Sequence, residues 1–156
     1  VAGFLDNSNV NGTGLRSVLF LSGCPHHCKN CQNPDMQNIF YGDTLTLEII
    51  WKRIEKNIPL IDGLTLSGGE PFEQSYALLP LVQKVKAAGL TVWCYTGYLY
   101  EDLLKNTNHA KLLSYIDVLV DGPFVFEQYD EHLKLKGSAN QRIIKLKEGK
   151  LESIIG

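Results

Sequence analysis

The sequence predicts one α/β domain over residues 1–156, built as a partial, open β/α barrel with mostly parallel strands. Short apolar runs alternate with longer amphipathic segments, which indicates strand–helix units joined by right-handed crossovers. A closed eight-fold barrel needs about 250 residues, whereas this chain has 156. Apolar residues make up 44% of the chain and charged residues 21%, as in ordinary globular domains.

The first half of the chain is expected to contain two strands with a helix between them. A strand is predicted at 17–22, SVLFLS, just before a Gly-Cys-Pro loop. Thr46 suits the N-cap of a helix that runs to about residue 57, because apolar residues recur there at helical spacing. The second strand is predicted at 63–67, GLTLS, and it ends in a Gly-Gly pair.

The second half continues the alternation. The elements expected there are, in order, a helix at 74–88, a strand at 90–96, one or two short helices within 100–115, a strand at 117–121, and a hairpin of 141–146 with 150–154. Gly89 is placed to cap the first of these helices. Functional groups of α/β sheets gather at the carboxyl ends of the strands, so the site is expected at that edge.

Charge and hydropathy exclude several classes of partner. The net charge is −2 and lysine and arginine form no run, so no nucleic-acid partner is expected. No apolar stretch approaches the roughly 20 residues that span a bilayer, so no membrane partner is expected. The chain does not open with the pattern of a secretory signal peptide, and we expect a cytoplasmic protein.

Three of the four cysteines, Cys24, Cys28 and Cys31, form a C-x3-C-x2-C loop after the first predicted strand. Such clustering favours metal or redox chemistry over a disulfide framework. Iron–sulfur clusters are normally held by four cysteines, but Cys94 is remote in sequence. One iron would then lack a protein ligand, and an open position is typical of catalytic metal sites. We predict metal-binding and catalytic roles for the three clustered cysteines.

Two other interpretations of the cysteines remain open at this point. A structural zinc site would add His26 or His27 to the three thiolates. A plain ferredoxin would recruit Cys94 as its fourth ligand. Against the second, Cys94 lies in a predicted strand, where a cysteine is usually a small buried apolar residue. The two histidines are expected to be exposed to solvent, with tuning of a cluster as the alternative role.

A second motif, Ser67-Gly68-Gly69-Glu70-Pro71, ends the second predicted strand. Together with the cysteine loop, it resembles the radical S-adenosylmethionine superfamily. The resemblance implies a [4Fe-4S] cluster and S-adenosylmethionine as cofactors, with Gly68, Gly69 and Glu70 meeting the amino group of the latter. Glycines let the backbone approach a ligand closely. A side chain at Gly69 is therefore expected to crowd the methionine moiety.

Within the superfamily, the chain resembles the activating enzymes of anaerobic ribonucleoside-triphosphate reductases. The matching segments are 10–14 with Arg16, 23–31, 63–71, 93–98, 120–124 and 137–142. The resemblance implies an oxidoreductase that cleaves S-adenosylmethionine reductively and forms a glycyl radical on the reductase, with a one-electron donor such as a flavodoxin. The alternatives are an activase of another glycyl-radical enzyme, such as pyruvate formate-lyase, or a non-catalytic iron–sulfur or zinc module.

The resemblance also suggests further contacts with S-adenosylmethionine. Many members carry an aromatic residue before the third cysteine, where this chain has Asn30, so the adenine is expected to meet the backbone from Asn30 to Gln32. Thr96 and Asp121 end two predicted strands and are expected to line the site. For Asp121 the alternative is a turn cap. Arg142 is a candidate partner for the S-adenosylmethionine carboxylate or for a carboxylate of the protein partner.

Overall fold

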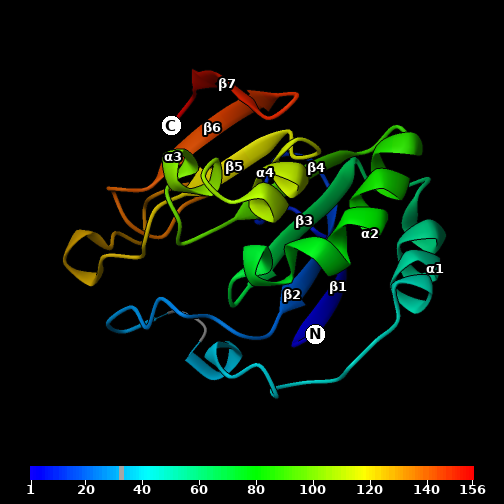
Figure 1. Ribbon diagram of the computed structural model, residues 1–156, viewed down its shortest axis with the longest axis horizontal. Coiled ribbons are helices and arrows are strands. Elements are labelled where there is room, and N and C mark those ends of the chain that lie inside the picture. Colours follow the sequence, from blue (N-terminus) through cyan, green and yellow to red (C-terminus); the bar gives the residue numbers. More distant parts are fainter. Residues whose placement is uncertain (32–33) are drawn as a thin grey trace.

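The structure is a computed structural model that describes residues 1–31 and 34–156, and it contains one mixed, open sheet (Figure 1). The strands are β1 (Gly3–Ser8), β2 (Arg16–Leu21), β3 (Gly63–Gly68), β4 (Thr91–Tyr95), β5 (Val118–Asp121), β6 (Arg142–Lys147) and β7 (Lys150–Ile154). They lie side by side in chain order, with β1 and β7 at opposite edges. The predicted α/β class and open sheet are confirmed.

The centre and the edges of the sheet differ in strand direction. Strands β2, β3, β4 and β5 are parallel, as predicted. Strand β1 is antiparallel to β2, β6 is antiparallel to β5, and β6 and β7 form the expected hairpin. The antiparallel outer strands make the sheet mixed. Because β2, β3, β4 and β5 are parallel, their carboxyl ends lie together along one end of the sheet.

The helices follow the predicted order and lie together on one face of the sheet (Figure 1). They are α1 (Leu47–Asn57), α2 (Ser75–Ala87), α3 (Tyr100–Leu103) and α4 (Thr107–Leu113), with single 3-10 turns η1 (Pro34–Gln37), η2 (Pro71–Gln74) and η3 (Phe126–Gln128). Thr46 caps α1 as expected, since its side chain accepts a hydrogen bond from the Ile49 N–H. None of the helices in the described ranges is long and apolar enough to cross a membrane.

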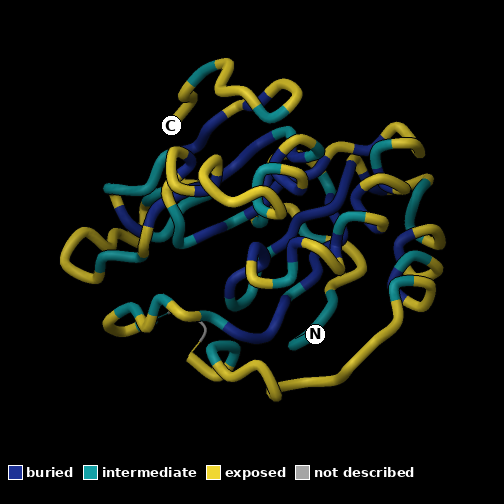
Figure 2. Tube along the Cα trace, in the orientation of Figure 1, coloured by how far each residue is buried: buried dark blue, intermediate teal, exposed yellow. Residues whose placement is uncertain are grey.

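Alternation along the strands divides the buried side chains between the two faces of the sheet. The large core on the helix side includes Leu19, Leu66 and Leu119, and Cys94 is fully buried among them. A smaller cluster of Trp93, Val118, Val120 and Ile143 covers the opposite face. In contrast, residues 38–46, which lead into α1, are exposed along their whole length (Figure 2).

Candidate functional site

A cavity of about 420 Å³ opens at the edge where the parallel strands end. Its lining comes from every predicted connection at that edge: Cys24, Cys28 and Cys31 after β2, Ser67 to Gly69 from β3, Tyr95 to Gly97 from β4, Gly122 and Phe124 after β5, and Leu135 to Gly137 before β6. Its volume lies within the range of small-molecule sites. The carboxyl ends of the parallel strands, where the strand pattern predicts the site, therefore carry a concave site.

The three clustered cysteines all line this cavity and are half-buried. Backbone hydrogen bonds fix the start of their loop, since Gly23 N–H donates to the Met36 carbonyl at 2.7 Å and Cys24 N–H donates to the Gln37 carbonyl at 3.1 Å. Burial, above all, raises the pKa of the Cys24 thiol to about 11. Because the thiolate is the metal ligand, Cys24 must lose its proton when a metal binds.

The donor set of the cavity fits a cluster with one open iron. Three thiols share one cavity, while Cys94 is fully buried on the helix side of the sheet and is not part of the lining. The prediction of Cys94 as a small buried residue is thus confirmed. Within residues 1–31 and 34–156, no three histidine, cysteine or acidic side chains already converge on one metal position. Of the zinc candidates, His27 is exposed and His26 is bonded elsewhere.

Gly69 is required by the protein itself. A Cβ atom at Gly69 would lie 2.5 Å from the carbonyl oxygen of Gly23 and 2.6 Å from that of Met36. Its own N–H donates to the Leu21 carbonyl at 2.8 Å. Gly68 has a φ of +99°, which favours glycine. The Gly-Gly turn and the cysteine loop therefore pack backbone against backbone, and both line the cavity.

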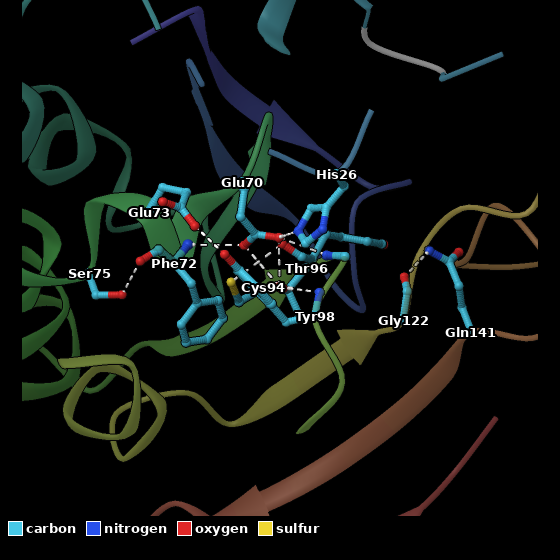
Figure 3. Close-up of polar contacts among 12 residues, drawn as sticks. His26, Glu70, Phe72, Glu73, Ser75, Cys94, Thr96, Tyr98, Gly122 and Gln141 are labelled. Carbon is cyan, nitrogen blue, oxygen red and sulfur yellow. Dashed lines mark hydrogen bonds and ion pairs between the residues drawn. The ribbon is translucent and has the colours of Figure 1, made fainter. Parts of the chain in front are cut away.

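The Glu70 carboxylate is fully buried and bonds to the protein (Figure 3). It accepts hydrogen bonds from the Phe72 N–H at 3.0 Å and the Gly97 N–H at 2.8 Å. The Thr96 hydroxyl lies 2.8 and 2.9 Å from its two oxygens, and His26 Nε2 lies 2.7 Å from Oε1. Glu70 is not among the residues that line the cavity. In this orientation the Glu70 side chain bonds to the cysteine loop, to η2 and to the end of β4, and its contact with a ligand stays a prediction.

Asp121 and Arg142 bond to each other. The buried Asp121 carboxylate accepts from Arg142 Nε at 2.9 Å, from Arg142 Nη2, and from the Tyr100 N–H at 2.8 Å. Arg142 Nη2 also donates to Glu101 at 2.8 Å. The bond with Asp121, above all, raises the pKa of Arg142 above its ordinary value. Asp121 ends β5, is absent from the lining, and accepts from the N–H of the first residue of α3, so in this orientation its partners are α3 and Arg142, and ribose binding stays a prediction.

Arg142→Ala is expected to lower the free energy of unfolding by about 3 kcal/mol, because removing one partner leaves a buried charge without its counterion. The Asp121 side chain is 1% exposed and would keep the Tyr100 N–H as its remaining donor among the described residues. Urea denaturation of the metal-free protein measures the loss. Lys105→Ala, which breaks the exposed pair with Asp102, is the control and should cost less than about 1 kcal/mol. Equal stability of the two variants would contradict the structural role.

The other predicted site residues divide between the cavity and its surroundings. Thr96 lines the cavity as expected. Asn30 is exposed, has a φ of +52° and is not part of the lining. Gln32 lies outside the described residues. Lys136, which the sequence analysis does not single out, lines the cavity with its Nζ 3.1 Å from the Gln141 carbonyl. Lys136 lies outside the sequence motifs, and the neighbouring Lys134, which does not line the cavity, has the same side chain, so no sequence signal identifies Lys136.

Comparison with known protein families agrees with this donor set. Residues 10–144 match the model of the 4Fe-4S single cluster domain. The chain is 40% identical over 146 residues to an anaerobic ribonucleoside-triphosphate reductase-activating protein of Haemophilus influenzae, covering 88% of this chain and 92% of the relative. The proteins of that name from Vibrio cholerae and Enterobacteria phage T4 are 42% and 35% identical, over 86% of this chain and 90% and 86% of their own lengths. The chain belongs to the family of anaerobic ribonucleoside-triphosphate reductase-activating proteins.

Proposed function

We propose that this protein activates an anaerobic ribonucleoside-triphosphate reductase by forming a glycyl radical on it. The observation that carries the proposal is the placement of three cysteines and a Gly-Gly turn around one cavity, with Cys94 buried in the helix-side core and outside the lining. Cys24, Cys28 and Cys31 would hold a [4Fe-4S] cluster and leave one iron open for S-adenosylmethionine. When bound, these two cofactors supply the electron transfer and the radical that takes a hydrogen atom from the partner.

The residues of the chain place and enclose the reactants, because cofactors carry the bond chemistry itself. Because Gly68 and Gly69 carry no side chains, their backbone can approach the methionine moiety closely at this part of the cavity. Thr96 and Gly97 form the neighbouring wall, and Glu70 fixes both from behind. The electron would come from a one-electron donor such as a flavodoxin.

The open sheet suits a protein substrate. Because the sheet is open, the cavity at the strand ends can receive a glycine-bearing loop. A carbon radical must be kept from water, so the reductase would complete the closure that this chain leaves unfinished. This argument requires only a large partner; the family of the chain identifies the reductase as that partner.

Lys136→Ala is expected to raise the dissociation constant of S-adenosylmethionine about tenfold, because a hydrogen bond to a charged group is worth roughly 1.5–3 kcal/mol. Lys136 brings a cation to the cavity wall, where it would meet the carboxylate of the ligand in place of Arg142. Equilibrium dialysis of the cluster-loaded protein under anaerobic conditions measures the constant. Lys134→Ala removes a nearby exposed lysine and should leave the affinity unchanged; the same weakening in both variants would remove Lys136 from the site.

Formation of 5′-deoxyadenosine tests the enzymatic part of the proposal. The reduced, cluster-loaded protein is incubated with S-adenosylmethionine alone, with the anaerobic reductase, and with pyruvate formate-lyase. We expect one equivalent of 5′-deoxyadenosine per reductase glycine modified. Release that depends only on pyruvate formate-lyase would favour the activase of another glycyl-radical enzyme. Release that needs neither protein and rises with a metabolite would overturn the protein-substrate proposal.

A further inference from the structure

His26 lies in the middle of the cysteine loop, yet its side chain leaves the loop and enters the protein (Figure 3). The imidazole is 16% exposed, whereas the adjacent His27 is exposed. Nε2 of His26 lies 2.7 Å from Glu70 Oε1. Because that oxygen also accepts from the Gly97 N–H at 2.8 Å, it acts as an acceptor and Nε2 carries the donated proton. The expectation of a solvent-exposed His26 was wrong.

Two more contacts fix the ring of His26 against the end of β4. It packs edge-on against Tyr98, with ring centroids 4.5 Å apart and an interplanar angle of 76°. It also covers Gly97, where a Cβ atom would lie 2.5 Å from Cδ2 of the imidazole. Position 97 must therefore be glycine for His26 to occupy this place, because even the Cβ atom of alanine would meet the ring. The His26 side chain therefore provides a packing contact between the cysteine loop and the end of β4.

The contacts continue from His26 into the wall of the cavity. Glu70 receives His26 on one side and Thr96 and Gly97 on the other. Cys24, His26, Cys28, Thr96 and Gly97 all line the cavity, whereas Glu70 is not part of the lining. A shift of the loop at His26 would thus move the Glu70 carboxylate and, with it, the wall on which the proposed ligand rests.

We infer that His26 is a positioning residue that couples the cysteine loop to the Thr96–Gly97 wall through Glu70. This inference rests on the proposed function for the identity of the ligand. It assigns His26 no contact with metal: the three cysteines alone hold the cluster. The role of His26 is to set where the open iron and the bound S-adenosylmethionine lie relative to each other. Removal of the ring should leave the iron content unchanged. The position of S-adenosylmethionine relative to the open iron should become less well fixed.

His26→Ala tests the coupling in the cluster-loaded protein. We expect wild-type iron content, about tenfold weaker binding of S-adenosylmethionine, and a smaller change of the electron paramagnetic resonance spectrum of the reduced cluster when S-adenosylmethionine is added. His26→Gln should restore much of both signals, because its amide nitrogen can reach the position of Nε2 and donate to Glu70. His27→Ala is the matched control and should behave like wild type.

Three outcomes would overturn the inference. The first is loss of iron from a folded His26→Ala protein, which would make His26 a ligand or a structural requirement. The second is that the His26→Ala and His27→Ala proteins give identical spectra and bind S-adenosylmethionine with identical affinity. The third is failure of His26→Gln to restore either signal. Amide hydrogen exchange of the metal-free protein separates this inference from the proposed function. Faster exchange at the Gly97 N–H in His26→Ala is expected even if wild type bound no S-adenosylmethionine. Unchanged exchange there would overturn the coupling alone.

Discussion

Alanine at Cys24, Cys28 or Cys31 is expected to abolish cluster binding, whereas Cys94→Ala should retain a full cluster. Each of the three thiols lines the cavity, and a cluster with only two protein ligands would be lost during purification. Cys94 is fully buried on the helix side of the sheet. Its replacement removes one sulfur atom from the core, which should cost about 1 kcal/mol of stability and no iron.

Iron and acid-labile sulfide per chain, measured after anaerobic reconstitution, decide this prediction. Circular dichroism of each variant shows whether the fold is retained. Loss of iron from a folded Cys94→Ala protein would make Cys94 a ligand and restore the ferredoxin interpretation. Full iron content in any one of the three loop variants would remove that cysteine from the ligand set.

Gly69→Val should produce the second large effect, a loss of roughly 3 kcal/mol or more in the free energy of unfolding, since overpacking against fixed atoms is costly. The sequence predicts that a side chain here crowds only the ligand. In the structure the added Cβ would meet the carbonyl oxygens of Gly23 and Met36 at 2.5 and 2.6 Å. These are backbone atoms that cannot rotate away, so the cysteine loop must move. Iron retention should therefore fall together with S-adenosylmethionine affinity.

Urea unfolding of the metal-free protein and iron content after reconstitution measure the two effects of Gly69→Val. Gly3→Ala is the control, because its Cβ atom would lie 3.8 Å from the nearest atom, in the side chain of Phe20, an ordinary contact. A Gly69→Val protein that matches Gly3→Ala in stability and iron content would show that the two loops do not pack as described.

The fold could be predicted where local patterns decide it. Central strands are continuous apolar runs because they are buried on both faces, and such runs predict the four parallel strands. Strand β1 was missed since it is an edge strand. Its residues 5–7 are exposed, and the sequence GFLDNS contains no apolar run. Pairing with Arg16 to Phe20, rather than its own pattern, makes it a strand.

The site divides in the same way. The spacing of the three cysteines identifies their loop, and the Gly-Gly turn is identified by its family resemblance and its place one βα unit after that loop. The orientation of Glu70, Asp121 and Arg142 depends on partners far along the chain: Glu70 meets a histidine 44 residues away, and Asp121 meets Arg142 across 21 residues. The sequence predicts that these side chains lie at the carboxyl ends of the strands. It does not show whether each one faces a ligand or bonds to another residue of the protein.

Electron paramagnetic resonance of the anaerobic reductase tests the central claim most directly. The reductase is mixed without oxygen with the reduced, cluster-loaded protein and S-adenosylmethionine, and the spectrum of the reductase is then recorded. The account predicts a glycyl-radical signal that requires S-adenosylmethionine and is absent when Cys28→Ala replaces the wild-type chain. A reductase that stays without a radical although the protein carries a full cluster and cleaves S-adenosylmethionine would contradict the claim.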